Sequence, residues 1–293
     1  MVAVVELSSG PGVGAAYARA ALGLLPGTRR GTTLPDVEMV QRGVVVDRSH
    51  LAAYDRVCGF RLSDTLPATY PHVLAFPLAM RLMTAPDFPL PLIGLVHITN
   101  RITVRRPVSA TTPLDLAVRV AALRDHPRGR QFDTIATASI DGEEVWHSVS
   151  TYLRIESRRS TENPPTSPGP DSPATLGSPA APGSPGAGSI WRVPARVGSD
   201  YAAVSGDRNP IHTSRLGARL FGFPRPIAHG MWTKARSLAA LEGRLPDTYT
   251  VEVAFKQPVL LPARAEFNAT PTSDGWSFAL RSKRPHLFGS ITS

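Results

Sequence analysis

The sequence predicts an α+β protein built from two related units. In each half of the chain, an apolar run of helical length precedes several segments in which apolar and polar residues alternate as they do in a strand. The spacing of two markers also recurs, because Tyr54 lies five residues before Gly59 and Tyr201 lies five residues before Gly206. A helix followed by an antiparallel sheet is the α+β pattern, and two such units would share one continuous core.

The first unit is expected to begin with a short helix around Tyr54. The apolar run over 73–83 then has the length of a second helix. Asp141-Gly142 separates two alternating segments and is a strong signal for a tight hairpin turn. The strands expected in this unit cover 96–106, 114–124, 131–140 and 143–155.

The second unit is expected to repeat this order. A short helix around Tyr201 precedes a longer helix over 229–241. Asp274-Gly275 marks a turn before the third alternating segment. The strands expected here cover 249–256, 263–270, 276–281 and 287–291.

A second pair of markers suggests how the units align. Met80 lies 27 residues before Pro107, and Met231 lies 27 residues before Pro258. Each proline precedes a valine and follows an alternating segment, which is what two diverged copies of one unit would show.

This alignment predicts that only the second unit carries chemistry. Phe60 falls where Asp207 stands, and Leu78 falls where His229 stands, so apolar groups occupy the polar positions of the second unit. We expect the first unit to widen the pocket of the second, to pack against it, or to do both.

The segment over 157–189 is predicted to be a linker. It consists almost wholly of Ser, Pro, Gly, Ala and Thr, which cannot bury enough apolar area to offset the entropy of ordering. Its prolines favour an extended chain. The predicted organisation is therefore an N-terminal unit over 1–156, a linker over 157–189 and a C-terminal unit over 190–293.

Composition excludes several classes of protein. The 293 residues include one cysteine, Cys58, so an internal disulfide is impossible and a reducing compartment is favoured. There is no apolar run long enough to span a bilayer, and no basic residue precedes Arg19 as a signal peptide would require. We therefore expect a cytoplasmic protein.

The net charge of +9 favours an anionic partner, and the scattered arginines favour a phosphate-bearing ligand or an acidic carrier protein over nucleic acid.

The stretch YAAVSGDRNPIH, from Tyr201 to His212, is the strongest chemical signal. It places a carboxylate, an amide and an imidazole (Asp207, Asn209 and His212) within six residues, behind a small step at Ser205-Gly206. A carboxylate and an imidazole held together can bind one water and move protons in both directions. Taken alone, Asp207 could be an ordinary turn residue and His212 an ordinary buried histidine.

The same stretch resembles the signature of the MaoC-like, hydratase 2 family. The family pattern has a Tyr, an aliphatic, a small residue, Gly-Asp-x-Asn-Pro, an aliphatic, His, and a small residue six positions further on. This chain fills every slot with Tyr201, Val204, Ser205, Gly206-Asp207-Arg208-Asn209-Pro210, Ile211, His212 and Ala218. The resemblance implies a double hot-dog fold, in which two antiparallel sheets each wrap a long helix. It also implies hydration of trans-2-enoyl thioesters to (3R)-3-hydroxyacyl thioesters, carried on coenzyme A or acyl carrier protein.

Roles follow for the residues of the motif. Asp207 is the expected general base or water anchor, and His212 the expected acid, since imidazole titrates near neutral pH. Asn209 is expected to fix the loop, and Ser205 and Gly206 to support it. This chemistry requires no metal and no redox cofactor.

The segment Pro226–Met231 is expected to begin the second long helix, whose exposed N–H groups could polarise an acyl carbonyl. The resemblance supports that role for His229-Gly230, although an ordinary helix start with a closely packed glycine would look the same. Met231 and Phe221 are expected in the pocket wall, and they could equally be core.

Three functions stay open on the sequence alone: the hydratase or dehydratase, a hot-dog thioesterase, and a non-catalytic subunit that binds an acyl thioester. A monomer and a homodimer are both compatible with two fused units. Gly10, Gly12 and Ala15 also fit the dinucleotide fingerprint, but too few residues surround them for a nucleotide domain, so we interpret them as the start of a helix.

Overall fold

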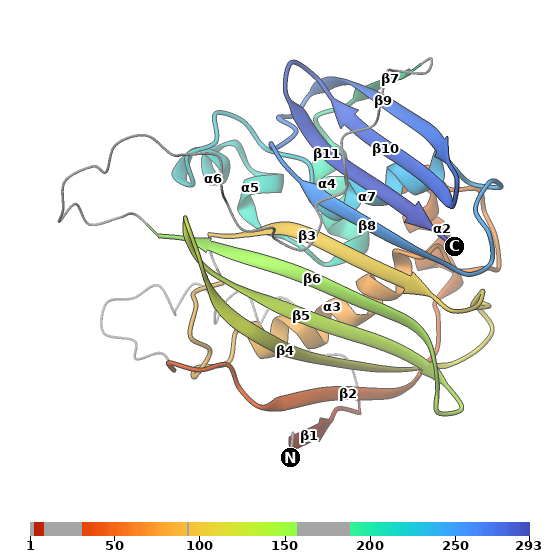
Figure 1. The fold of residues 1–293 in the computed structure, drawn as a ribbon. Helices are drawn as coiled ribbons and strands as arrows, with labels where there is room; N and C mark the ends of the chain where they lie inside the picture. The colour runs from red at the N-terminus through yellow and green to blue at the C-terminus, as the bar shows by residue number, and fades with distance from the viewer. Residues whose placement is uncertain (1–2, 9–30, 93, 157–187) are drawn as a thin grey trace.

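The computed structural model describes residues 3–8, 31–92, 94–156 and 188–293. Eleven strands form one sheet in the order β1-β2-β4-β5-β6-β3-β8-β11-β10-β9-β7. The sheet curves around helices that lie on one of its faces (Figure 1). Neighbouring strands run antiparallel, except that β1 runs parallel to β2. The predicted α+β class is confirmed.

Within the described residues, the first unit contributes six strands and two helices. The strands predicted over 96–106, 114–124, 131–140 and 143–155 are β3 to β6, and the predicted helix over 73–83 is α3. The sequence reasoning did not predict β2. The elements are β1 (Ala3–Glu6), β2 (Val37–Val44), α2 (Arg48–Cys58), α3 (Tyr70–Met83), β3 (Leu95–Val104), β4 (Leu114–His126), β5 (Gly129–Ile140) and β6 (Glu143–Ile155).

The second unit contributes five strands and four helices. The four predicted strands are β8 to β11, the predicted long helix is α7, and β7 and α6 were not predicted. The elements are β7 (Ser189–Val193), α4 (Val197–Ser205), α5 (Pro210–Thr213), α6 (Arg215–Leu220), α7 (Gly230–Ala239), β8 (Tyr249–Phe255), β9 (Ala263–Thr272), β10 (Gly275–Arg281) and β11 (Pro285–Thr292).

The two units share a single sheet, where two sheets were expected. Strands β3 and β8 pair antiparallel over six residues, and the Thr103 and Thr250 hydroxyls lie 3.0 Å apart across the junction. Pairing at this junction satisfies the backbone groups of two strands that would otherwise be sheet edges. The helices of both units therefore pack on the same continuous surface (Figure 1).

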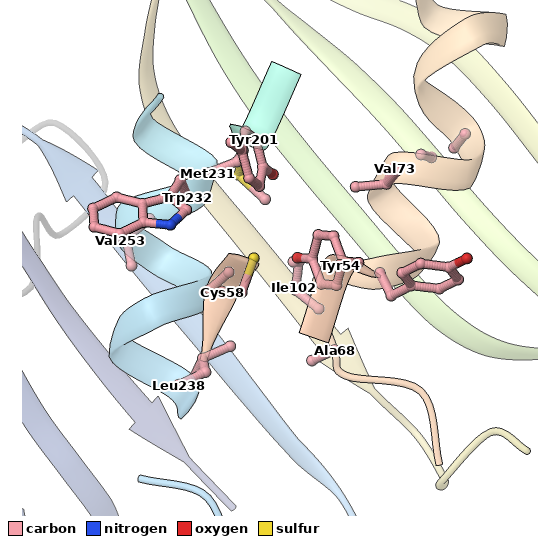
Figure 2. Close-up of a cluster of buried hydrophobic side chains, with 14 of the residues drawn as sticks. Tyr54, Cys58, Ala68, Val73, Ile102, Tyr201, Met231, Trp232, Leu238 and Val253 are labelled. Atoms are coloured by element: carbon pink, nitrogen blue, oxygen red, sulfur yellow. The ribbon is translucent and has the colours of Figure 1, made fainter. Parts of the chain in front are cut away.

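The core between the units is aromatic. Figure 2 shows Tyr54 and Cys58 of α2 gathered with Tyr201 of α4 and Trp232 of α7. The rings of Tyr54 and Tyr201 lie 6.2 Å apart, and the Trp232 indole N–H donates to the Val57 carbonyl at 3.0 Å. The two tyrosines that mark the repeat in the sequence therefore meet at the interface between the units.

A buried lysine also joins the units. Lys234 of α7 is fully buried, and its ammonium donates to the Asn100 carbonyl at 3.2 Å and the Val251 carbonyl at 3.1 Å. It also bonds Asn100 Oδ1 at 2.5 Å, while the amide group of Asn100 donates to Ser148 and Ser150 at 3.0 Å each. Burial lowers the pKa of Lys234 well below its usual value. This network spans α7, β3, β8 and β6.

The repeat holds at the short helices and fails at the long ones. Gly59 and Gly206 both cap their helices in the left-handed conformation, with φ of 82° and 76°. Pro107 and Pro258 both lie three residues beyond a paired central strand. The methionine alignment is wrong, because Met80 lies near the end of α3 whereas Met231 is the second residue of α7. The second unit also has α5 and α6 between its short and long helices, where the first unit has only the loop over 59–69.

The hairpin prediction at Asp141-Gly142 is confirmed. Both residues have positive φ, 51° and 83°, which a tight turn between β5 and β6 requires.

The predicted linker overlaps residues 157–187, which lie outside the described residues, and Ser189 already belongs to β7. Gly10, Gly12 and Ala15 also lie outside them. Among the helices that the structure describes, none is long and apolar enough to cross a membrane.

Candidate active site

The loop after α4 positions Asp207. Gly206 caps α4, donating its N–H to the Ala202 carbonyl at 3.1 Å, and its left-handed conformation turns the chain sharply. The Asp207 N–H then donates to the Ser205 hydroxyl at 3.2 Å, and the Asn209 N–H donates to Asp207 Oδ1, also at 3.2 Å. Ser205 and Gly206 therefore shape the loop that holds the carboxyl group.

Asn209 and Pro210 start the short helix that carries His212. The Asn209 carbonyl oxygen Oδ1 accepts from the Ile211 N–H at 3.3 Å, which makes Asn209 the N-cap of α5. Pro210 occupies the first helical position, where its missing N–H costs nothing. The cap thus turns His212 back toward Asp207.

The backbone fixes the tautomer of His212. Its Nδ1 lies 2.8 Å from the Ile227 carbonyl oxygen, which can only accept, so Nδ1 carries the proton and Nε2 carries the lone pair. The ring is buried, and burial lowers its pKa below 6.5, while the Asp207 charge and the Ile227 carbonyl oppose that shift. The neutral imidazole is therefore the favoured form at neutral pH.

His229 holds the other two groups in place. It is the N-cap residue of α7, and its Nε2 donates to the Asp207 backbone carbonyl at 2.9 Å. Its ring stacks on His212 with centroids 3.6 Å apart and lies 4.9 Å from the Tyr201 ring. Burial, with a smaller contribution from the neighbouring His212, lowers the pKa of His229 to about 3. His229 therefore acts as a neutral support for the loop.

Asp207, His212 and His229 converge on one point. One carboxylate oxygen and one nitrogen from each ring lie within 4.8 Å of one another. A water with two hydrogen bonds of about 2.8 Å joins acceptors roughly 4.5 Å apart, so this spacing fits a bridging water. The same groups are ligand types that suit zinc, and His212 Nε2 and His229 Nδ1 are the nitrogens that no carbonyl engages.

Gly230 begins α7 beside this cluster. As the first residue of the helix, it has an N–H without an intrahelical acceptor. A Cβ at this position would meet the Phe255 ring at 3.1–3.2 Å, so the ring covers the space where a side chain would lie. Met231 is buried in the core, whereas Phe221 is 37% exposed at the end of α6. The pocket-wall role expected of Phe221 and Met231 stays a prediction.

The first unit contributes residues to the site that the sequence reasoning missed. Burial lowers the pKa of His72 to about 4 and that of His97 to about 3, and the Asp207 charge opposes both shifts, whereas burial and the Asp207 charge together raise the pKa of Tyr152. His97 packs on Tyr152, with ring centroids 4.6 Å apart, and on Phe255 at 5.0 Å. They come from α3, β3 and β6, and no spacing in the sequence links them to Asp207.

Comparisons with known proteins identify the relatives of this chain. The family described as "MaoC like domain" matches residues 197–279, which include the loop and α7. The chain is 39% identical over 276 residues to 3-hydroxyacyl-thioester dehydratase X of Mycobacterium tuberculosis, covering 93% of this chain and 95% of the relative.

Solved structures agree with the fold. The crystal structure of HtdX from M. tuberculosis has a TM-score of 0.73 and 36% identity, covering 87% of this chain and 98% of that one. A conserved hypothetical protein of the same organism, described as a double hotdog fold, has a TM-score of 0.50 and 15% identity over 90% of this chain and 97% of that one. The chain therefore belongs to the MaoC-like dehydratase family and has its double hot-dog fold.

Proposed function

We propose that the protein catalyses the reversible hydration of trans-2-enoyl thioesters to 3-hydroxyacyl thioesters. The observation that carries this proposal is the convergence of Asp207 and a neutral His212 at a spacing that fits one bridging water. The 3-hydroxyacyl-thioester dehydratase named among the relatives supports the reaction class.

The tautomer of His212 sets the order of proton transfers. The water lies between the Asp207 carboxylate and the Nε2 lone pair. As the water oxygen attacks C3, Nε2 takes a proton, and the Asp207 charge stabilises the resulting imidazolium. The electron pair of the double bond moves toward the thioester oxygen, and the imidazolium then returns its proton to C2. Asp207 thus anchors the water, and His212 is first the base and then the acid.

The tip of α7 supplies the second element of the mechanism. Negative charge develops on the thioester oxygen as C3 is attacked. The Gly230 N–H and the partial positive charge of the helix start can stabilise that oxygen by a few kcal/mol, about the effect of one oxyanion-hole donor.

Finer features of the proposal rest on the family resemblance. These are the (3R) product, a substrate carried on coenzyme A or acyl carrier protein, and a cytoplasmic location. His212 moves the proton and Asp207 anchors the water, so the scheme uses neither a metal nor a redox cofactor. Monomer and homodimer remain alternatives that gel filtration separates.

The test is turnover of a short trans-2-enoyl-coenzyme A, followed by the loss of enoyl absorbance. We expect Asp207→Asn and His212→Gln to lower kcat by about a thousandfold or more, because each removes one of two groups that act as a unit. Asp200→Asn is the matched control, because Asp200 lies in α4 and forms a surface ion pair with Arg196 at 3.4 Å. Near-normal turnover of Asp207→Asn would exclude the mechanism.

Two further measurements separate the alternatives. Release of free thiol from the acyl thioester, with no change at the double bond, would indicate a thioesterase. Loss of turnover on treatment with a chelator, and recovery on adding zinc, would indicate that the three-residue cluster binds a metal. We expect neither result.

A further inference from the structure

Helix α6 presents basic and apolar side chains together to solvent. Leu216 and Leu220 are 69% and 75% exposed, and Phe221 follows at the end of the helix with 37% of its surface exposed. Arg215 and Arg219, which are also exposed, each precede one of the leucines. Residues four apart share one face of a helix, so the arginines and the leucines form two adjacent rows. We call these five side chains the α6 surface.

The inner face of α6 fixes this surface against the helix that carries His212. Gly217 and Ala218 are buried, and a Cβ at Gly217 would meet the Pro210 side chain at 2.5 Å. Only glycine lets the two helices approach so closely. Pro210 is the first residue of α5, and Figure 1 shows α6 beside α5 at the edge of the second unit. The α6 surface therefore has a defined position next to the catalytic segment.

The candidate active site reaches solvent in the same part of the chain. The side chain of Asp207 is 31% exposed, and Arg208 beside it is exposed. Arg215 follows His212 by only three residues. A thioester on a long flexible arm can therefore extend toward Asp207 from a partner that is bound to α6.

The charge around the α6 surface has one sign. The chain has no Asp or Glu from Arg208 to Leu241. Arg208 and Arg225, on either side of α6 in the sequence, are exposed like the arginines of the helix. With the described acidic residues, none of the arginines at 208, 215, 219 and 225 forms an ion pair. Such groups attract an acidic partner, and the net charge of +9 adds to the attraction.

We propose that the α6 surface binds an acidic acyl carrier protein. Carboxylates of the carrier pair with the arginines, and apolar side chains beside those carboxylates cover Leu216 and Leu220. Exposed apolar groups that lie together within a polar surround are typical of a protein-binding surface. The phosphates of coenzyme A could use the arginines, but they would leave the leucines in water. The proposal rests on the proposed hydration of an enoyl thioester, and it names the carrier that delivers the acyl group.

The test compares one trans-2-enoyl group carried on a purified bacterial acyl carrier protein and on coenzyme A. Arg219→Glu and Leu220→Gln each change one exposed side chain of the α6 surface. We expect each to lower kcat/KM for the carrier-bound substrate about tenfold, through KM, and to change that of the coenzyme A substrate by less than about twofold. Added salt should lower the carrier-bound kcat/KM of the parent more than that of Arg219→Glu.

Matched controls place the same changes elsewhere. Arg192→Glu lies on β7, and Leu62→Gln lies in the loop after α2, and both side chains are exposed. Neither control should alter kcat/KM for either substrate. Equal carrier-bound kcat/KM for the parent, Arg219→Glu and Leu220→Gln would overturn the proposal, and so would a parent that hydrates only the coenzyme A substrate.

Other occupants of the α6 surface would give different results. If two copies of the chain meet there, Leu220→Gln should reduce the mass measured by light scattering to that of one chain. If a membrane binds there, the parent should bind phosphatidylglycerol vesicles and Leu220→Gln should not. Either result, with carrier-bound turnover unchanged by the variants, overturns the proposal. Turnover of the coenzyme A substrate by the parent separates the two proposals: if it is absent the proposed function fails, and if it is normal only the docking proposal is at stake.

Discussion

Acidification should unfold this protein through histidines that are buried in the neutral form. Burial is the main cause that lowers the pKa of His72 to about 4, of His97 to about 3 and of His229 to about 3, from 6.5. Each folded pKa lies below the unfolded value, so the unfolded chain binds more protons between about pH 6.5 and 4. The free energy of unfolding therefore rises with pH in this window, and it is lost as the pH falls.

The size of the loss follows from the shifts. A pH of 5 lies 1.5 units below the unfolded histidine pKa of 6.5, so an unfolded histidine is almost fully protonated. Each of the three folded rings stays mostly neutral at this pH. One pH unit corresponds to about 1.4 kcal/mol, so each ring lowers the free energy of unfolding by about 2 kcal/mol. The three rings together lower it by about 6 kcal/mol. Typical proteins are stable by about 5–15 kcal/mol, so this loss brings the protein close to unfolding.

Urea unfolding followed by tryptophan fluorescence at pH 7, 6 and 5 measures the effect. The parent protein should lose on the order of 5 kcal/mol between pH 7 and pH 5. His72→Gln should reduce that loss by about 2 kcal/mol, because glutamine does not titrate. His126→Gln, at the end of β4, is the control for replacing a histidine. If His72→Gln and the parent lose equal free energy, His72 is not held neutral by the fold and the reasoning is wrong.

Three further predictions concern the site and the junction. Gly230→Ala should lower kcat/KM by about tenfold to a hundredfold in the enoyl assay, because the new Cβ would meet the Phe255 ring at 3.1–3.2 Å and displace the tip of α7 that supplies the amide; full activity would remove the α7 tip from the mechanism. Lys234→Met should lower the free energy of unfolding by about 2–4 kcal/mol, since it leaves Asn100 Oδ1 and two carbonyls without their donor; an unchanged urea midpoint would contradict this. The acid limb of kcat/KM should lie below pH 6.5, because activity needs neutral His212 and burial lowers its pKa; a limb above pH 7 would point to another group.

Local chemistry explains why much of the fold could be predicted. Alternation of apolar and polar residues located β3 to β6 and β8 to β11, since a strand with one buried face has period two. The Asp141-Gly142 turn was recognisable because two adjacent positive φ angles require such residues. Strand β7 is short and begins at the edge of the region predicted as linker, so its pattern gave little signal.

The methionine alignment shows where such reasoning failed. It rested on a single spacing, and a spacing cannot reveal that α5 and α6 had been inserted before α7. As a result, the first unit was expected to contribute only apolar groups to the site. The structure instead buries His72, His97 and Tyr152 of that unit, and the Asp207 charge acts on the pKa of each.

The sequence by itself determined the reacting pair. Asp207, Asn209 and His212 lie within six residues, so one turn and one cap are enough to bring the carboxylate and the imidazole together. Only the tertiary structure decided the tautomer of His212, the support from His229 and the burial of His72 and His97 in the first unit. Those features depend on the Ile227 carbonyl, on stacked rings and on strands joined across the sheet. These contacts link residues that are distant in the chain, and no local pattern encodes them.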